Sequence, residues 1–248
     1  MITNAALIPI RNSSTRLPNK SLKKIKNNLR SIDIVIERAK KTNFFVILTT
    51  STESSDDVLV DIAKEHSIAI FRGSLNNKIK RWYDCLKTFE IQNALIVDGD
   101  DLCFDYDIGI RSIQQLTSSS SELITHTKNI VPGFFTYAMT FNAIEKLYSF
   151  ARSDSIDTDV IDKFIKKANL KTNFITLKSH EQNKDIRLTL DYVEDLEFFR
   201  KLYEHVDILD DGKTIVKFLE ENESIVDINL FRHKDFLLNQ AKFNEGIN

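Results

Sequence analysis

The sequence predicts an α/β fold, with a mostly parallel central sheet and helices on both of its faces. Short apolar runs rich in Ile, Val, Leu and Phe alternate along the chain with longer stretches of helical period, which is typical of parallel strands joined by helical crossovers. Runs such as residues 94–97 are apolar throughout, as expected of strands that are buried on both faces. With 248 residues and 42% hydrophobic composition, we expect one sizeable core and a single domain over residues 1–248.

Each predicted element follows from its own apolar pattern. The strands are short apolar runs, predicted in chain order at residues 5–10, 44–50, 69–71, 94–97, 123–127, 134–140, 174–177 and 188–190. The helices show apolar residues at helical spacing and are predicted at residues 32–41, 56–66, 78–89, 108–116, 143–150 and 157–168. Two more stretches of helical period, residues 193–205 and 214–222, lie in the C-terminal third, and we expect the C-terminal helices (about residues 193–248) to pack on the domain.

Charge and cysteine content exclude several classes of protein. The 34 basic residues are balanced by 36 acidic ones, so we expect no nucleic-acid partner, because such binding requires excess positive charge. Two cysteines without a CxxC spacing favour neither a disulfide framework nor a zinc site. No run is apolar over the ~20 residues that a membrane span needs, and the first apolar run is too short for a signal peptide. We therefore expect a soluble, cytoplasmic protein that binds no membrane.

The segment LIPIRNSSTRLPNKSL, residues 7–22, leads from the first predicted strand into a loop with three cations, Arg11, Arg16 and Lys20. Phosphate sites commonly combine guanidinium and ammonium groups, and open α/β sheets bind ligands beyond the carboxyl ends of their strands. The alternative is an ordinary polar surface loop. The chain has no GxxxxGK[ST] and no GxGxxG motif, which excludes a P-loop and a dinucleotide fingerprint.

Carboxylates follow the strand in ALIVDGDDLCFD, residues 94–105. Asp98 and Asp100 lie on the same side of the chain if it stays extended, and clustered carboxylates are the hard oxygen ligands that suit Mg²⁺. Asp98 and Asp101 are also candidate ligands for a second metal ion or for contacts with a second substrate. The alternative is a turn whose Asp side chains cap the next helix.

Two further segments carry polar groups at predicted helix starts. In RLTLDYVEDLEFF, residues 187–199, Asp191 ends a short strand, and its spacing from Glu194 resembles a capping box. The functional alternative, a metal ligand, requires Asp191 to face Asp100. FRGSLNNKIKRWYDC, residues 71–85, places polar and cationic side chains near a helix start, where anions bind: Arg72, Asn77, Lys80 and Arg81.

In their order along the chain, these segments resemble the CMP-sugar nucleotidyltransferase family, which includes CMP-Kdo synthetase, CMP-sialic acid synthetase and spore-coat-polysaccharide cytidylyltransferase-like proteins. IPIRNSSTRLPNKSLKKI resembles the family's opening motif, IPAR-x-x-STRLPGK-x-L. The resemblance continues through IERAKK, ILTTSTESSDDVL, FRGS with RW, VDGDDL, PGFFTYAMTFNAIEKL, RLTLDYVEDLE and FLEENESIVDIN. It implies the nucleotide-diphospho-sugar transferase (GT-A/Rossmann-like) fold, Mg²⁺ dependence, and transfer of CMP from CTP to an acceptor with release of pyrophosphate.

The resemblance also assigns roles to matching positions. Arg11, Arg16 and Lys20 match the triphosphate-binding loop. Asp100 matches the Asp of the family's GD-x-P motif, and Asp191 matches the Asp of its D-x-PEDL motif, which completes the metal site. These five residues are the predicted catalytic group.

The predicted CTP contacts extend beyond that group. The backbone of residues 7–11 lies where the family reads cytosine, and the segment after residue 71 matches the nucleoside-contacting loop. The residues predicted to contact CTP are Leu7, Pro9, Ile10, Arg11, Ser14, Arg16, Lys20, Arg72, Ser74, Asn77, Arg81 and Asp98.

The chain departs from the family pattern at several positions. Asn19 stands where glycine usually precedes the lysine, Ile10 replaces alanine, and Asn77 stands where spore-coat-like members tend to have aspartate. Leu102 and Cys103 stand where proline is common. None of these changes removes a charge assigned to the phosphates or to the metal.

The resemblance predicts small-molecule substrates and a homodimer. The expected acceptor is an acidic sugar, such as a 3-deoxy-ulosonic or nonulosonic acid, or a phosphonate.

Two alternatives stay open. LIVDGDD, with ILDDGK as an acidic partner, is also similar to the nucleophile motif of haloacid-dehalogenase-type phosphatases, in which Asp98 forms an aspartyl-phosphate. The second alternative function is that of a non-catalytic nucleotide-binding protein.

Overall fold

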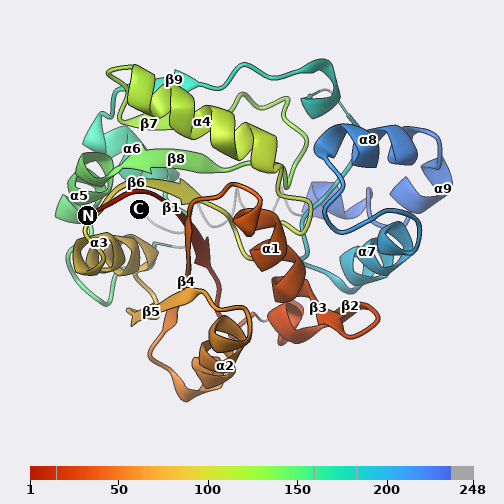
Figure 1. Ribbon diagram of the computed structural model, residues 1–248, viewed down its shortest axis with the longest axis horizontal. Coiled ribbons are helices and arrows are strands. Elements are labelled where there is room, and N and C mark those ends of the chain that lie inside the picture. The colour runs from red at the N-terminus through yellow and green to blue at the C-terminus, as the bar shows by residue number, and fades with distance from the viewer. Residues whose placement is uncertain (15, 159, 183, 236–248) are drawn as a thin grey trace.

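A computed structural model describes residues 1–14, 16–158, 160–182 and 184–235 of the chain (Figure 1). Its centre is a seven-stranded mixed sheet with strand order β5-β4-β1-β6-β8-β7-β9. Strands β5, β4, β1 and β6 are parallel to one another, β8 is antiparallel to both β6 and β7, and β9 is parallel to β7. The bounds are Ile2–Pro9 for β1, Phe45–Ser51 for β4, Ala69–Gly73 for β5, Ile91–Ile96 for β6, Leu123–Thr125 for β7, Tyr137–Thr140 for β8 and Thr172–Phe174 for β9.

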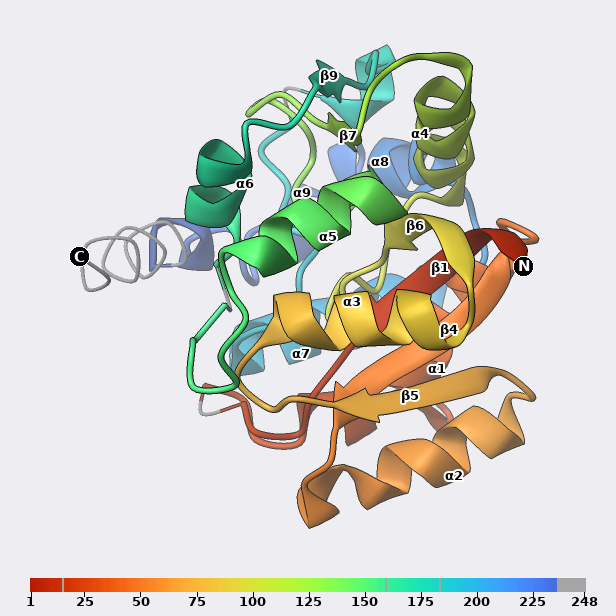
Figure 2. The same cartoon turned by 90° about the vertical axis from the view of Figure 1, so that its left-hand side faces the viewer.

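Helices cover both faces of the sheet (Figure 2). Alternate side chains of β1 point into two separate cores: Ala6 and Ile8 into one, Ala5 and Leu7 into the other, as the two-residue period of a strand requires. The first core takes side chains from α1 (Ser31–Lys40), α2 (Asp57–Glu65), α4 (Tyr106–Ser118), α7 (Val193–His205), α8 (Gly212–Glu220) and α9 (Glu223–Val226). The second takes side chains from α3 (Lys78–Thr88), α5 (Phe141–Ser149) and α6 (Asp162–Ala168).

The predicted α/β fold with a mostly parallel sheet is confirmed, and so are most of its elements. The strand predicted at residues 188–190 is wrong. This segment is buried, but its backbone N–H groups bind loop carbonyls, Leu188 N to Pro132 O and Leu190 N to Asp100 O, instead of a neighbouring strand. The strands predicted at residues 134–140 and 174–177 are shorter or shifted, and lie at Tyr137–Thr140 and Thr172–Phe174.

The helix predicted from residue 157 begins instead at Asp162. Thr158 uses its N–H and its hydroxyl to bind Asn76 and Asn77 at the start of α3, so this stretch is tied to another element and does not form a helical turn. The sequence pattern also missed a short antiparallel hairpin, β2 (Lys24–Lys26) with β3 (Leu29–Arg30). Strands of two or three residues are too short to show a period.

Side chains of the C-terminal helices α7, α8 and α9 belong to the same buried cluster as side chains of β1 and α1. They lie together at one end of the molecule, with α7 beside the β2–β3 hairpin (Figure 1). The part of the predicted C-terminal region at residues 236–248 lies outside the described residues. Within the described part of the chain, none of the helices has the length and apolarity needed to cross a bilayer.

Candidate active site

Four parallel strands, β1, β4, β5 and β6, end at the same edge of the sheet, and the loops that follow them carry the predicted site residues. The loop after β1 passes very close to the loop after β6. A Cβ atom on Gly99 would lie 2.5 Å from Cδ1 of Ile10 and 3.0 Å from the carbonyl oxygen of Pro9. Glycine therefore allows the acidic loop to approach the cationic loop directly.

Lys20 joins two carboxylates that lie far apart in the sequence. Its Nζ donates to Oδ2 of Asp100 at 2.6 Å and to Oδ1 of Asp191 at 3.2 Å. The Lys20 side chain is only 12% exposed. Burial alone would lower the pKa of Lys20, but the charges and hydrogen bonds of Asp100 and Asp191 outweigh it and raise that pKa above its usual value. The structure thus places Asp191 opposite Asp100, as the functional alternative required.

Asp191 receives two more cations. Arg16 Nη2 donates to its Oδ1 at 2.8 Å, and Arg187 Nη2 donates to its Oδ2 at 3.1 Å. Burial would raise the pKa of Asp191, but the positive charges of Lys20, Arg16 and Arg187 lower it below its usual value. The capping-box interpretation of Asp191 with Glu194 is wrong, because Asp195 is the residue whose Oδ2 accepts from the N–H groups of Asp191 and Tyr192.

Asn19 explains how the cationic loop tolerates the loss of glycine. Its backbone lies in the left-handed region, with φ of 53° and ψ of 37°. Asparagine is one of the few residues other than glycine that adopt this conformation at low cost. Asn19 therefore preserves a backbone turn immediately before Lys20, and the side chain of Lys20 can reach the carboxylates.

Asp56 anchors the start of the same loop. This fully buried carboxylate accepts from the backbone N–H of Asn12 at 2.8 Å and from the hydroxyl of Thr50 at 2.9 Å. Its second oxygen also accepts from the backbone N–H of Ser51 at the end of β4. The loop after β1 is thereby fastened to the end of β4.

Arg11 has a hydrogen-bond partner in the loop between β5 and α3. Its Nη1 donates to the carbonyl oxygen of Leu75 at 2.7 Å, in the loop between β5 and α3. Arg81, which is 2% exposed, donates from Nη1 to the carbonyl oxygen of Ser74 at 2.6 Å. The two arginines thus both donate to carbonyls of the β5–α3 loop, whereas Arg16 and Lys20 donate to Asp191.

Two residues of the predicted CTP-binding set have side chains that form several hydrogen bonds within the protein. Asn77 is fully buried: its Nδ2 donates to the carbonyls of Ala151 and Ser153, and its Oδ1 accepts from Lys80 N at 2.8 Å to cap α3. Arg72 donates to the carbonyls of Ser51 and Glu53 and pairs with Asp57. These contacts account for both side chains structurally, and their contact with CTP stays a prediction.

The acidic loop turns after β6 and does not stay extended. Asp101 N donates to the carbonyl of Asp98 at 3.0 Å, so the side chains of Asp98 and Asp100 take different partners. Asp98 Oδ2 accepts from the hydroxyl of Thr136 at 3.0 Å, whereas Asp100 binds Lys20. Burial is the main reason that the pKa values of Asp98 and Asp101 are raised, and neighbouring carboxylates add to the effect.

The remaining predicted CTP contacts lie in or beside β1. Leu7 and Ile10 are buried, and the carbonyls of Leu7 and Pro9 accept from Val97 N and Gly99 N, next to β6. The Ser14 hydroxyl accepts from Leu17 N at 3.4 Å within the cationic loop. These atoms frame the strand end, and their recognition of cytosine stays a prediction.

The donor set at this edge fits a divalent cation. Asp100 and Asp191 both direct a carboxylate oxygen to the same ammonium group, so the two carboxylates converge on one point that a cation occupies. Hard oxygen donors of this kind suit Mg²⁺, which usually takes one or two protein carboxylates together with substrate phosphates. Asp100 and Asp191 are the residues that would hold it.

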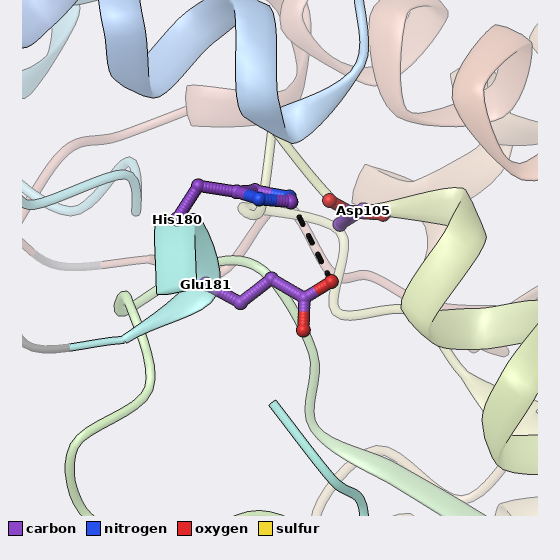
Figure 3. Close-up of side chains that lie close together, drawn as sticks. All are labelled: Asp105, His180 and Glu181. Atoms are coloured by element: carbon purple, nitrogen blue, oxygen red, sulfur yellow. Dashed lines mark ion pairs between the residues drawn. The ribbon is translucent and has the colours of Figure 1, made fainter. Parts of the chain in front are cut away.

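A second cluster of potential metal ligands, Asp105, His180 and Glu181, occurs among the described residues (Figure 3). Asp105 Oδ1 accepts from two N–H groups and so caps α4. Glu181 is fully buried and forms an ion pair with the guanidinium of Arg111. We interpret this cluster as a structural junction between α4, α8 and the 3-10 turn at Ser179–Glu181.

Sequence reasoning missed several residues that shape the site. Arg187 and Asp195 flank Asp191 four residues before and four residues after it, and both are fully buried. An opposite-charge pair placed symmetrically about a candidate ligand is a signal that the sequence does contain. Thr136 and Asp56 give no such signal, because only the fold brings them to the strand ends.

The fold and the site together define a class of protein. The mostly parallel seven-stranded mixed sheet is like that of the nucleotide-diphospho-sugar transferases. The model of one protein family, described as cytidylyltransferase, matches residues 5–225. The chain belongs to this cytidylyltransferase family.

Two individual relatives match most of the chain. The chain is 26% identical over 227 residues to an uncharacterised protein of Methanocaldococcus jannaschii, covering 90% of this chain and 93% of the relative. It is 23% identical over 206 residues to the spore coat polysaccharide biosynthesis protein SpsF of Bacillus subtilis, covering 80% and 85% respectively.

Solved structures share the fold. A cytidylyltransferase from Leptospira borgpetersenii superposes with a TM-score of 0.82 at 24% identity, over 91% of this chain and 97% of the other. A CMP:2-keto-3-deoxy-manno-octonic acid synthetase, solved in complex with CTP, superposes with a TM-score of 0.60 at 15% identity, over 82% and 98%.

These findings favour the predicted family over the phosphatase alternative. In that alternative, ILDDGK supplies an acidic partner for Asp98. In the structure, Asp211 of this segment caps α8 by accepting from Thr214 N at 2.8 Å. Asp98 binds Thr136.

Proposed function

We propose that this cytidylyltransferase transfers CMP from CTP to an acidic acceptor, with release of pyrophosphate and with dependence on Mg²⁺. The observation that carries the proposal is the placement of the Lys20 ammonium group between Asp100 and Asp191. This placement puts a phosphate-binding cation and two candidate metal ligands at one point. The family membership supports CTP as the nucleotide.

The chain's own residues perform most of the proposed work by charge neutralisation and positioning, as in other reactions at phosphorus. Arg11, Arg16 and Lys20 hold the β- and γ-phosphates, which depart as pyrophosphate. Asp100 and Asp191 would hold Mg²⁺, which when bound would supply Lewis-acid polarisation of the α-phosphate. A hydroxyl acceptor loses its proton to solvent. The acceptor oxygen forms a bond to the α-phosphorus, the bond from that phosphorus to the bridging oxygen breaks, and pyrophosphate leaves with the electron pair of the broken bond.

The contacts of Arg16 and Lys20 support this role. Both donate to Asp191 in the structure, and the Arg16 guanidinium also lies over the ring of Tyr192, 5.4 Å from its centroid. Contact with an aromatic face restricts the guanidinium without using its N–H groups. These donors are therefore held near the site before nucleotide arrives, which reduces the entropy lost on binding.

The proposed acceptor is an acidic sugar, such as a 3-deoxy-ulosonic or nonulosonic acid, or a phosphonate. A protein with the same fold supports this proposal, because it is a CMP:2-keto-3-deoxy-manno-octonic acid synthetase. We also propose that the protein acts on small molecules as a homodimer.

A nucleotide panel tests the proposal. Thermal unfolding is measured with CTP, UTP, ATP and GTP, each with and without Mg²⁺, and pyrophosphate release from CTP is then followed over a set of acidic sugars and phosphonates. We expect the largest rise in Tm with CTP and Mg²⁺, and pyrophosphate release with one acceptor class. Stabilisation by CTP with no turnover over the whole acceptor set would favour a non-catalytic nucleotide-binding protein. No response to any nucleotide would contradict the proposal.

A further inference from the structure

The two oxygens of Asp191 face different environments. Oδ1 accepts from Arg16 and Lys20 on the side of the cationic loop. Oδ2 accepts from Nη2 of Arg187 at 3.1 Å, and the side chain of Arg187 is fully buried. Arg187 therefore occupies one oxygen of Asp191 and leaves the other to the site.

Arg187 is itself fixed by Asp195. Nε of Arg187 donates to Oδ1 of Asp195 at 3.0 Å, and Nη2 donates to Oδ2 of Asp195 at 3.1 Å. The same Oδ2 accepts from the backbone N–H of Asp191 at 2.8 Å. Asp195 thus holds the backbone of Asp191 directly and holds its side chain through Arg187.

Asn229, from the segment after α9, closes this network. It is fully buried, and its Nδ2 donates to Oδ1 of Asp195 at 2.9 Å and to the carbonyl oxygen of Arg187 at 3.2 Å. One amide group therefore fixes both members of the Arg187–Asp195 pair. A residue near the C-terminal end of the described chain is connected in this way to the candidate metal ligand.

We propose that Arg187, Asp195 and Asn229 are positioning residues that present Oδ1 of Asp191, and not its Oδ2, to the divalent cation. This inference rests on the proposed function, because it takes Asp191 to be a metal ligand. A buried guanidinium shared by two carboxylates stays charged and cannot rotate freely, so the carboxylate of Asp191 cannot turn its second oxygen towards the site. Residues that orient metal ligands in this way typically change metal affinity or activity by about 10- to 100-fold when they are replaced.

Two substitutions break the network, and a third serves as a matched control. Arg187→Lys keeps the charge but cannot bridge Asp191 and Asp195 with a planar fork. Asn229→Ala removes the amide and leaves both charged partners in place. Arg232→Lys is the control, because Arg232 lies over the same Tyr192 ring and pairs with α7 through Glu194, not through Asp191.

The experiment measures Mn²⁺ binding to the full chain without nucleotide, by electron paramagnetic resonance, and then the Mg²⁺ concentration that gives half-maximal stabilisation by CTP. We expect Arg187→Lys to weaken Mn²⁺ binding by about 10-fold or more, Asn229→Ala to weaken it by a smaller factor, and Arg232→Lys to leave it unchanged. A purely structural role would lower Tm without moving either metal dependence. Circular dichroism verifies folding, and Asn229→Ala carries the test alone if Arg187→Lys does not fold.

The outcomes separate this inference from the proposed function. If the wild-type protein binds Mn²⁺ and both folded variants bind it with the same affinity, the inference is overturned and the proposed function stands. If wild-type protein binds CTP but neither Mn²⁺ nor Mg²⁺ affects it, both the inference and the metal part of the proposed function are wrong. Equal weakening by Arg232→Lys and Arg187→Lys would also overturn the inference, since it would indicate a general loss of α7 packing.

Discussion

Nζ of Lys20 and Oδ2 of Asp100 lie 2.6 Å apart, although the two residues are 80 positions apart in the sequence. The contact joins the loop after β1 to the loop after β6, and the same ammonium group reaches Asp191 at the start of the α7 region. Lys20 therefore connects three separate segments of the chain. The loop after β1 is not an ordinary polar surface loop, because its lysine binds carboxylates from two other segments.

The left-handed backbone of Asn19 leads to a prediction about the cationic loop. Asn19→Gly should leave the free energy of unfolding within roughly 0.5 kcal/mol of wild type, because glycine adopts this conformation freely. Asn19→Val should cost about 1–2 kcal/mol, because a β-branched side chain is strained there. Urea unfolding measures both, and Asn28→Val in the β2–β3 turn region controls for the change of side chain. Equal stability of the two Asn19 variants would show that the backbone does not require φ > 0.

The buried amide of Asn77 leads to a prediction about the β5–α3 loop. Asn77→Asp should destabilise the protein by about 1–3 kcal/mol, because a carboxylate cannot donate to the carbonyls of Ala151 and Ser153 and would face them as a buried charge. Chemical denaturation at neutral pH measures the effect. Asn76→Asp is the control, since Asn76 is exposed, and it should change stability little. A stable Asn77→Asp variant would contradict the structural role assigned to this amide.

His66 leads to a prediction about pH. Its ring nitrogens lie 2.9 Å from Asp33 and 2.9 Å from Glu37, and the hydrogen bond with Asp33 is the main reason that the pKa of His66 is raised. A raised folded-state pKa means that protonated His66 stabilises the fold fully below the usual histidine pKa of about 6.5, and that this stabilisation is lost as pH rises through the folded-state value. Asp33 and Glu37 stay charged over this range, because their own pKa values are lowered.

The measurement compares urea midpoints near pH 6 and pH 8 for wild type and His66→Gln. We expect wild-type stability to fall more steeply over this interval than the stability of the variant. His205→Gln, on the exposed side of α7, is the control and should follow wild type. Parallel pH profiles for wild type and His66→Gln would contradict the assigned ion pairs.

The sequence was sufficient for the fold class because continuous apolar runs and helical periods are local signals. It failed at residues 188–190, where a short apolar run is extended and buried but binds loop carbonyls of Pro132 and Asp100. Periodicity reports burial, and it does not report which backbone groups are the hydrogen-bond partners. The β2–β3 hairpin was missed because its strands are too short to carry a period.

The candidate site, like the fold, could be predicted from the sequence only in part. The family resemblance assigned Arg11, Arg16, Lys20, Asp100 and Asp191 to one group. Hydrogen bonds link the last four of them, whereas Arg11 donates to the carbonyl of Leu75. Local reasoning offered Asp191 and Glu194 as a capping box, but the N-cap of α7 is Tyr192, and its backbone N–H donates to Asp195. Glu194 and Asp195 are adjacent in the sequence, and spacing alone does not decide which of them accepts from the N-cap residue.

We propose that Asp100, Lys20 and Asp191 form the site for CTP with its metal ion. Isothermal titration calorimetry of CTP in the presence of Mg²⁺ measures this binding, with Asp100→Asn compared to Asp61→Asn, a control at an exposed carboxylate paired with Lys64 on α2. We expect Asp100→Asn to weaken Mg²⁺-dependent binding of CTP by at least about tenfold, and Asp61→Asn to leave it unchanged. Equal affinity of wild type and Asp100→Asn for CTP with Mg²⁺ would show that Asp100 is not part of the site.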